Sequence, residues 1–195
     1  MLLYKRRPRR LYQGGINYEK NFIIFICLVF ACCGGCKKNK DSSENIEYIY
    51  DKVKETNEEY TDEELEKIRT GITQWAEGFL LVGSNATEEE KRLIRQSFDK
   101  CIVSDEEREK VEEDRQEFYK DSYVKIGLVD TTIINDQKVQ YEDEEMGKIT
   151  CTVNVYGTRN NNRFQRTYDL DLLITFQDDV SIREIDKISW ESVEY

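Results

Sequence analysis

The spacing of apolar residues changes near Ser122, and this change constrains the fold more than any other feature of the sequence. Before Ser122, apolar residues recur at intervals of three and four, which is the period of an amphipathic helix. After Ser122 they alternate with polar residues, which is the period of a strand with one buried face. The sequence therefore predicts helices first and an antiparallel sheet afterwards, in an α+β arrangement.

Three helix starts share one local pattern, the capping box. In this pattern a hydroxyl accepts from a first-turn amide, and a glutamate three residues later accepts from the amide of the cap residue. The pairs are Thr61 with Glu64, Thr87 with Glu90, and Ser104 with Glu107. They predict helices over 62–82, 87–102 and 105–120. The first is expected to be the core helix, because its apolar residues share one face. These residues are Leu65, Ile68, Ile72, Trp75, Phe79 and Val82.

Four runs of alternating apolar residues after Ser122 predict strands. The apolar faces comprise Val124, Ile126 and Leu128; Ile149, Cys151, Val153 and Val155; Phe164, Tyr168, Leu170, Leu172, Ile174 and Phe176; and Ile182, Ile188 and Trp190. A brief further strand is expected at 138–141, and Ile185 is out of phase, which indicates a bulge. Polar breaks are expected at 135–136, 142–147, 160–162 and 177–179. Short breaks favour an antiparallel meander of four to five strands with one face covered and the other wet.

The order of elements from Thr61 to Tyr195 resembles the nuclear transport factor 2-like or cystatin-like cone. The run RFQRTYDLDLLITFQDD followed by VSIREIDKISWESV is its most typical part. The resemblance implies N-terminal helices packed on a curved antiparallel sheet. Exported members of this superfamily include small lipoproteins and the assembly factors of type IV secretion (conjugation) systems, which look similar in the order of anchor, tether, helices and sheet. Those assembly factors usually have an uncleaved transmembrane helix, from which this chain departs.

The N-terminal region has the pattern of an export signal. Six basic residues between Lys5 and Lys20 precede an apolar run from Phe22 to Cys33. This run has 12 residues, whereas a helix needs about 20 residues to cross a bilayer. The length instead matches the apolar region of a signal peptide. Export across a bacterial plasma membrane is therefore expected.

The end of the apolar run resembles a bacterial lipoprotein signal, in which a lipid-modified cysteine becomes the first residue of the mature chain. The segment Leu28-Val29-Phe30-Ala31-Cys32 matches this pattern best, and Cys36, which precedes the polar KKNK, is the alternative. A simple signal segment, cleaved or uncleaved, remains a further alternative. The expected organisation is an export signal with a lipobox-like cysteine cluster over 1–36, a polar tether and short amphipathic helix over 37–60, and a folded domain over 61–195. The short helix follows from Ile46, Ile49 and Val53, which lie at heptad spacing and indicate either a solvated helix or an oligomerising stalk.

Charge and composition exclude several functions. Outside the leader before Phe22 the chain has 23 basic and 39 acidic residues, a net charge of −16. This field repels phosphate backbones, so nucleic acid is not an expected partner. The sequence has no histidine, which excludes imidazole-based triads and imidazole-based zinc sites. It also lacks a glycine-rich phosphate loop, and no metal or other cofactor is expected.

The remaining chemical candidates are few. Cys101 and Cys151 lie on apolar faces and are interpreted as buried free thiols, with a disulfide as the alternative. Catalytic pairs would be Asp130 with Tyr123, or Asp169 and Asp171 with Tyr168, but each aspartate is better explained as part of the wet face of the sheet. Two acidic runs, 142–145 and 178–179, raise a calcium hypothesis, and solvated hairpin tips explain them better. Trp75 and Trp190 are interpreted as core residues, and exposed tyrosines as anchors for a partner.

These observations favour a lipid-anchored exported protein that acts as a binding or assembly module on the outer face of the plasma membrane. A protein partner is expected, and a homo-oligomer is compatible with the pattern. One alternative is a subunit of a conjugation or type IV secretion envelope complex. A second is a small-ligand-binding or enzymatic domain that uses the interior of the cone. An interior filled by Trp75, Phe79, Phe176 and Trp190 would exclude this second alternative.

Overall fold

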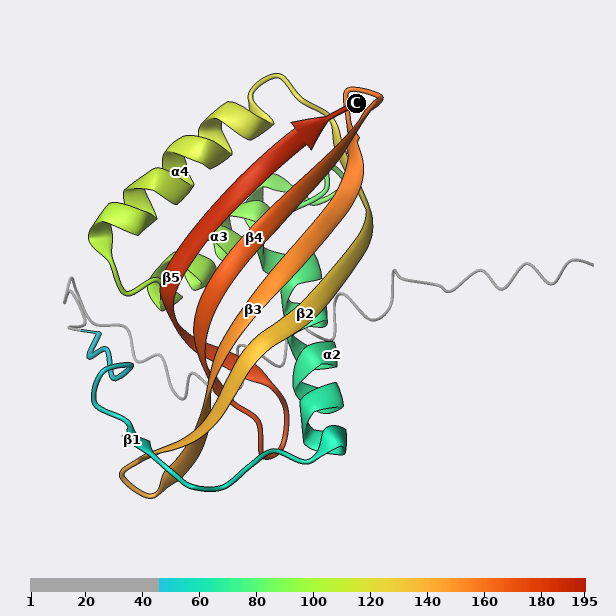
Figure 1. Cartoon of the computed structure of the whole chain (residues 1–195). Coiled ribbons are helices and arrows are strands. Elements are labelled where there is room, and N and C mark those ends of the chain that lie inside the picture. The colour runs from blue at the N-terminus through green and yellow to red at the C-terminus, as the bar shows by residue number, and fades with distance from the viewer. Residues whose placement is uncertain (1–45) are drawn as a thin grey trace, which may run out of the picture. The chain divides into compact units, whose positions relative to one another are not determined.

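The computed structural model describes residues 46–195 as one compact unit. The predicted export signal and tether, and with them both candidate lipidation sites, Cys32 and Cys36, lie outside the described residues. Three helices pack on a curved five-stranded antiparallel sheet (Figure 1). The helices are α2 (Asp62–Phe79), α3 (Glu88–Cys101) and α4 (Asp105–Tyr119), and the strands are β1 (Lys54–Glu55), β2 (Val124–Tyr141), β3 (Glu144–Arg159), β4 (Asn162–Thr175) and β5 (Ser181–Glu194). The strand order is β1-β2-β3-β4-β5. The predicted α+β class and antiparallel meander are confirmed.

The helix starts agree with the predicted caps, with one difference. The boxes at Thr61 and Thr87 are complete. At Ser104 the hydroxyl accepts from the Glu107 amide, but the reciprocal bond is missing, so the predicted full box is wrong at this site. The Glu107 carboxylate instead lies against the backbone of Ile188 on β5, which lowers the pKa of the carboxyl by less than burial raises it. A tertiary contact therefore replaces half of a local motif.

Helix α2 is shorter than predicted. It ends at Phe79, so Val82 is not on its apolar face but lies in the following connection. The Val82 amide donates to the hydroxyl of Tyr119 at 2.7 Å, which holds this connection against the end of α4.

Strand β2 differs from the sequence-based prediction. The predicted break at 135–136 and the separate strand at 138–141 are both wrong, because β2 runs without interruption over 18 residues. A register shift between Ile133 and Asn135 absorbs the irregularity as a bulge within the strand. The irregularity expected near Ile185 is confirmed, since the pairing of β4 with β5 shifts register there and leaves Ile185 fully buried.

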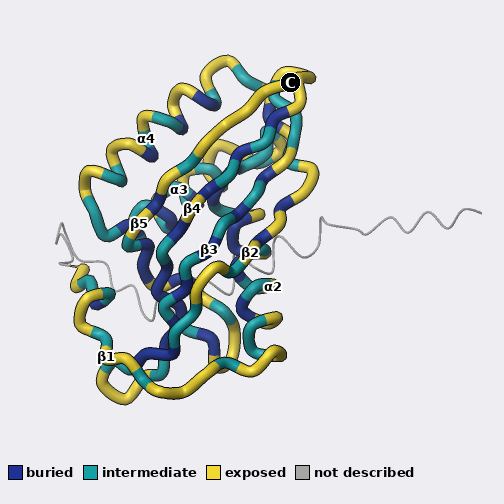
Figure 2. Tube along the Cα trace, in the orientation of Figure 1, coloured by how far each residue is buried: buried dark blue, intermediate teal, exposed yellow. Residues whose placement is uncertain are grey.

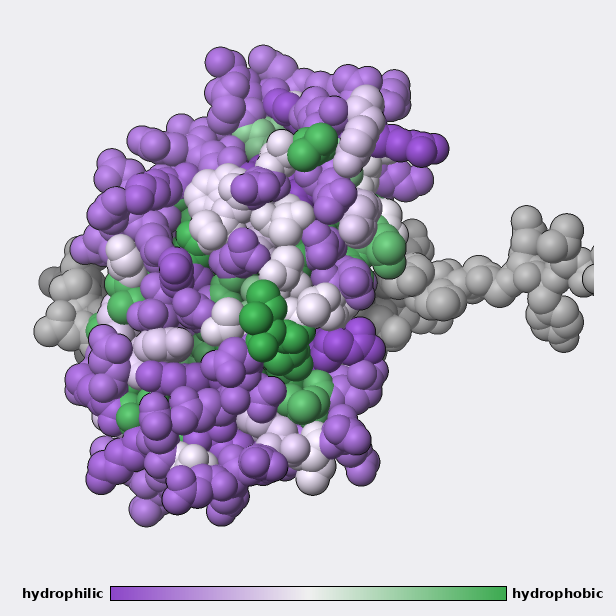
Figure 3. Space-filling model, viewed as in Figure 1, coloured by the Kyte–Doolittle hydropathy of each residue, from purple (hydrophilic) through white to green (hydrophobic). Residues whose placement is uncertain are grey.

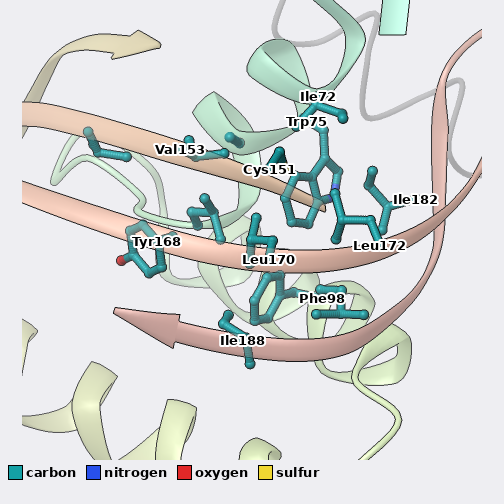
Figure 4. Close-up of a cluster of buried hydrophobic side chains, with 14 of the residues drawn as sticks. Ile72, Trp75, Phe98, Cys151, Val153, Tyr168, Leu170, Leu172, Ile182 and Ile188 are labelled. Carbon is teal, nitrogen blue, oxygen red and sulfur yellow. The ribbon is translucent and has the colours of Figure 1, made fainter. Parts of the chain in front are cut away.

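The core fills the space between the helices and the inner face of the sheet (Figure 2). Trp75 of α2 stacks on Phe98 of α3, with ring centroids 5.9 Å apart, and both point toward β4 (Figure 4). Trp75 and Phe176 are buried, and Phe79 and Trp190 are partly buried against the same cluster. Full burial of a Leu, Ile or Phe side chain stabilises the fold by about 1.5–3 kcal/mol relative to leaving it exposed. The interior is thus occupied by side chains of the protein.

The segment before α2 is not helical, so the amphipathic helix expected from Ile46, Ile49 and Val53 is wrong. The segment forms a turn and the two-residue strand β1, which pairs with the end of β2. Ile49 packs on the outer face of the sheet in a small second cluster, with Val139, Met146 and Leu173. The buried carboxylate of Glu184 accepts from the amide of Ile49 at 2.8 and 3.0 Å and from the amide of Tyr50 at 2.8 Å. These contacts hold the segment in a non-helical form, because the amides of Ile49 and Tyr50 donate to the Glu184 side chain on β5 and not to carbonyls of a helix.

Candidate binding cleft and sheet surface

The structure does not bring the predicted catalytic pairs together. Asp169 and Asp171 lie on the outer face, where they accept hydrogen bonds from Thr152 at 2.7 Å and Thr150 at 2.6 Å. Tyr168 lies on the inner face and is 4% exposed, so the sheet separates it from both aspartates. The interpretation of these aspartates as polar residues of the outer face is confirmed.

Asp130 and Tyr123 are also apart. Asp130 is an exposed residue of β2, and Tyr123 precedes the strand and is 56% exposed. Seven residues separate them along extended chain, which corresponds to roughly 20 Å. The two side chains therefore do not form a joint acid and hydroxyl site.

The two described cysteines are free thiols, as interpreted from the sequence. Burial raises the pKa of Cys101 to about 11 and the pKa of Cys151 to about 12. Both groups therefore stay protonated near neutral pH, and the thiol is a much weaker nucleophile than the thiolate.

The acidic runs lie in solvent-exposed connections in part, because Glu144 and Glu145 of the first run begin strand β3. Glu142 and Asp143 form the turn between β2 and β3, and Asp178 and Asp179 lie between β4 and β5. Within residues 46–195, no group of three or more histidine, cysteine, aspartate or glutamate side chains is placed to hold a metal ion.

The outer face of the sheet exposes apolar side chains along β2. Leu128 is 59% exposed, and it pairs across the strands with Tyr156, which is 37% exposed. Ile134 at the bulge is 63% exposed. Figure 3 shows apolar atoms over this part of an otherwise largely hydrophilic face. Strand β1 pairs only with Val139 and Gln140, so most of β2 is an open sheet edge, a feature that commonly serves for association with another chain.

A cleft of about 360 Å³ lies where α2 ends, between α3 and α4. Two contacts fix the connection that forms its floor. The amide of Ser84 donates to the carbonyl of Val124 at 2.8 Å, and the hydroxyl of Ser84 accepts from the amide of Val124 at 2.6 Å. The lining residues are Phe79, Leu80, Val82, Ser84, Glu88, Lys91, Ile94, Arg95, Glu112, Arg115, Gln116, Tyr119, Lys120 and Ser122.

Arg115 is the most buried charged residue of this cleft, at 9% exposed. Its guanidinium lies over the ring of Phe98, 4.7 Å from the centroid. Nη1 donates to Asp99 at 2.8 Å, and Glu112 is 3.6 Å away. Nη2 is buried without an acceptor among the described residues. Arg115 thus has carboxylate neighbours on both α3 and α4, whereas its Nη2 donor has no acceptor among the described residues.

The other cations of the cleft are less buried. Lys91 pairs with Glu88 at 2.9 Å. Arg95 donates from Nε to the carbonyl of Lys91 at 3.2 Å. In the part of the chain that the structure describes, neither Arg95 nor Lys120 lies within ion-pair distance of a carboxylate.

Tyr119 adds a neutral hydrogen-bond donor. Burial raises the pKa of Tyr119 to about 12, so the phenol keeps its proton near neutral pH. Its oxygen accepts from the Val82 amide, and its own proton has no acceptor within residues 46–195. The cleft therefore combines an apolar wall with donors that lack acceptors.

Sequence reasoning did not identify this cleft. One indication was present, because Arg115 falls on the same helical face as Val111 and Phe118, at the spacing of buried positions. A cation among apolar residues of one helix face indicates either a buried ion pair or a site.

The fold defines an α+β domain with a curled antiparallel sheet, compatible with a cone-like domain. No protein-family model, no curated protein and no solved structure matches this chain. Among residues 46–195, none of the helices has the length and apolar character needed to span a membrane.

Proposed function

We propose that the protein is an exported lipoprotein that acts as a binding module on the outer face of the plasma membrane. The basic leader, the 12-residue apolar run and the cysteine cluster support export and lipid attachment at Cys32, with Cys36 as the alternative. A single acyl chain gives only marginal membrane binding, so the two chains of a diacylglycerol group matter for stable anchoring.

The position of the cleft is the observation that carries this proposal. The described chain enters at Ile46 and is fastened near the end of β2, where Ile49 packs beside Val139. The cleft lies at the other end of the same strand, where Ser84 contacts Val124. Along 18 strand residues, at about 3.3 Å per residue, the two ends are several tens of Å apart. A lipid attached upstream of Ile46 would therefore be joined to the domain near Tyr48, which contacts the C-terminal end of α3 and the first turn of α4 rather than the ends next to Val124.

The filled interior favours surface binding over interior binding. Trp75 and Phe176 occupy the space that a cone-interior ligand would need, and Phe79 and Trp190 pack against the same cluster. A function that uses the cone interior, as ligand site or active site, therefore has no support from the geometry.

The open edge of β2 favours one alternative, a subunit of a conjugation-type envelope complex. Leu128, Ile134 and the free strand edge would pair with a second copy of the chain, as expected for an assembly factor. Crosslinking of the membrane-bound protein discriminates the two proposals. A ladder of homo-oligomers that Leu128→Asp abolishes would favour the assembly role.

Intact mass of the protein expressed in a lipoprotein-competent bacterium tests the anchor. We expect Cys32→Ala to remove a diacylglycerol-sized mass increment and to release the protein from the membrane fraction, with Cys36→Ala having this effect if Cys36 is the modified residue. Cys33→Ala is the matched control, because it removes a neighbouring thiol. If neither Cys32→Ala nor Cys36→Ala changes the mass or the location, lipid anchoring is excluded.

A further inference from the structure

We propose that the cleft between α2, α3 and α4 binds a small organic monoanion, a carboxylate attached to an apolar body. This inference deepens the binding role proposed above and rests on it for the biological context, whereas the affinity itself is a property of the folded domain.

The cleft has the opposite charge to the rest of the domain. Residues 46–195 carry 20 basic and 37 acidic residues, a net charge of −17. The cleft reverses this sign locally, with four cations and two carboxylates among its lining residues, namely Lys91, Arg95, Arg115 and Lys120 against Glu88 and Glu112. An anion is repelled by most of the domain surface and attracted at this point, because nearby fixed charges dominate the local field.

The cleft has the size of a small-molecule site and an apolar wall. The cleft volume of about 360 Å³ lies at the lower end of the range of about 300–1,000 Å³ that is typical of small-molecule sites. Phe79, Leu80, Val82 and Ile94 supply apolar surface to one ligand. An inorganic anion would leave this surface unused, and a neutral apolar ligand would leave the cations without a counter-charge.

Several hydrogen-bond donors of the cleft lack a carboxylate partner among the described residues. Arg95, Lys120 and the Tyr119 hydroxyl have donor hydrogens with no carboxylate partner among the described residues. A carboxylate is an acceptor with two oxygens and about four lone-pair sites, so one headgroup can serve several of these donors. The positive charge of Arg115, deeper in the cleft, strengthens the attraction without requiring a direct contact.

The two carboxylates set the charge of the ligand. Glu88 and Glu112 line the cleft next to Lys91 and Arg115, with which they lie 2.9 and 3.6 Å apart. Together with Asp99, which pairs with Arg115 at 2.8 Å, they leave the four cations an excess of one positive charge, which a monoanion neutralises and a dianion would exceed. A carboxylate therefore fits the cleft better than a phosphate ester.

Isothermal titration of the full purified chain tests this proposal, in lipid nanodiscs with empty nanodiscs as the blank or, if lipid attachment fails, in buffer with buffer as the blank. The probes are 4-phenylbutyrate and octanoate, each compared with its neutral amide, and inorganic phosphate. We expect both carboxylates to bind, the amides to bind at least about ten-fold more weakly, and phosphate not to compete, since about 1.4 kcal/mol of lost charge interaction corresponds to ten-fold in affinity.

Variants locate the binding. Arg95→Gln and Lys120→Gln should each weaken carboxylate binding several-fold, and Val82→Phe should abolish it by filling the cleft. Arg92→Gln is the matched control, because it removes an exposed guanidinium from the same helix outside the cleft. Circular dichroism establishes that each variant is folded.

Three outcomes overturn the proposal: no binding of either carboxylate to the folded wild type, equal binding of carboxylate and amide, or full competition by phosphate. The titration does not depend on how the chain is anchored. Failure of lipid attachment therefore appears in the mass measurement, and failure of the cleft appears in the titration.

Discussion

Asp114 and Arg115 are neighbours in α4, yet they lie in two different environments. On the sheet side, Asp114 accepts from Nη2 of Arg166 at 2.7 and 2.8 Å and from the indole of Trp190 at 2.9 Å. Arg166 is 1% exposed and lies over the ring of Phe118. Both oxygens of the Asp114 carboxylate, which is 29% exposed, are engaged by buried partners from the sheet, so this side of α4 is structural.

On the other side, Arg115 faces α3 and the cleft. It is almost as buried as Arg166, and it also lies over a phenylalanine ring. Its principal partner Asp99 is one-third exposed, and an open volume lies beside it. The difference shows that burial of a charge does not by itself indicate a site. Each guanidinium has one buried nitrogen without an acceptor among the described residues, Nη2 in Arg115 and Nε in Arg166, so the open volume beside Arg115 is what marks its side of α4 as a candidate site.

Breaking the sheet-side pair should have the largest effect. Asp114→Asn leaves the charge of Arg166 buried without a counter-charge, and we expect a loss of about 3–5 kcal/mol in the free energy of unfolding. Urea denaturation measures this loss. Glu113→Gln, the exposed neighbour, is the control and should change stability by less than about 0.5 kcal/mol. Equal costs for the two substitutions would show that the pair does not hold α4 on the sheet.

The corresponding change on the cleft side should be milder. Arg115→Met keeps apolar contact with Phe98, and the released Asp99 carboxylate can be hydrated, so we expect a loss of about 1–2 kcal/mol. The same urea experiment measures it. A loss as large as that of Asp114→Asn would contradict the distinction between the two sides of α4.

The smallest effect is expected at the start of α4, where Glu107 contacts β5. Burial raises the pKa of the Glu107 carboxyl above its ordinary value of 4.5. The folded state therefore binds this proton more tightly than the unfolded chain, and the wild type loses stability as pH rises from 4.5 through the raised pKa. Glu107→Gln keeps a side-chain oxygen against the backbone of Ile188 without this loss.

We therefore expect Glu107→Gln to be more stable than the wild type at pH 7, by less than about 1 kcal/mol because the carboxyl is partly exposed. The advantage should disappear at pH 4, where the wild-type carboxyl is protonated in both states. Thermal unfolding at the two pH values measures it, with Glu109→Gln as the exposed control. An advantage of equal size at both pH values would exclude ionisation of Glu107 as its cause.

Local features were predictable from the sequence, and features with distant partners were not. The caps at Thr61 and Thr87 close within four residues, so the sequence contains both partners. The full cap at Ser104 and the helix near Ile49 were predicted wrongly, because the decisive partners, Ile188 and Glu184, lie far along the chain.

The same reason explains the candidate site. The alternation of apolar residues predicted the two faces of β3 and β4, and with them the positions of Asp169 and Asp171. It wrongly placed Leu128 on the covered face, because a register shift after Ile126 turns Leu128 to the outer face. The cleft depends on how three helix ends meet and on the point where α2 stops, and neither is encoded in a periodic pattern. Of the cleft residues, Arg115 was the one that the sequence pointed to. It is a cation at a helix position whose spacing from Val111 and Phe118 is that of buried residues, which indicated an unusual environment.

The way residues 46–60 attach to the sheet would determine how the domain responds to tension if the chain is anchored upstream of Ile46, as proposed above. Tension applied at Ile46 would act first on the contacts of Tyr48 with Lys100 and Arg108, then on the two amides held by Glu184 and on the two-residue strand β1, and only afterwards on the long ladders between β2 and β5. Release of residues 46–60 would lengthen the connection by up to about 50 Å, at roughly 3.5 Å per extended residue. We therefore expect the segment to detach and extend under tension before the three helices and the four long strands unfold.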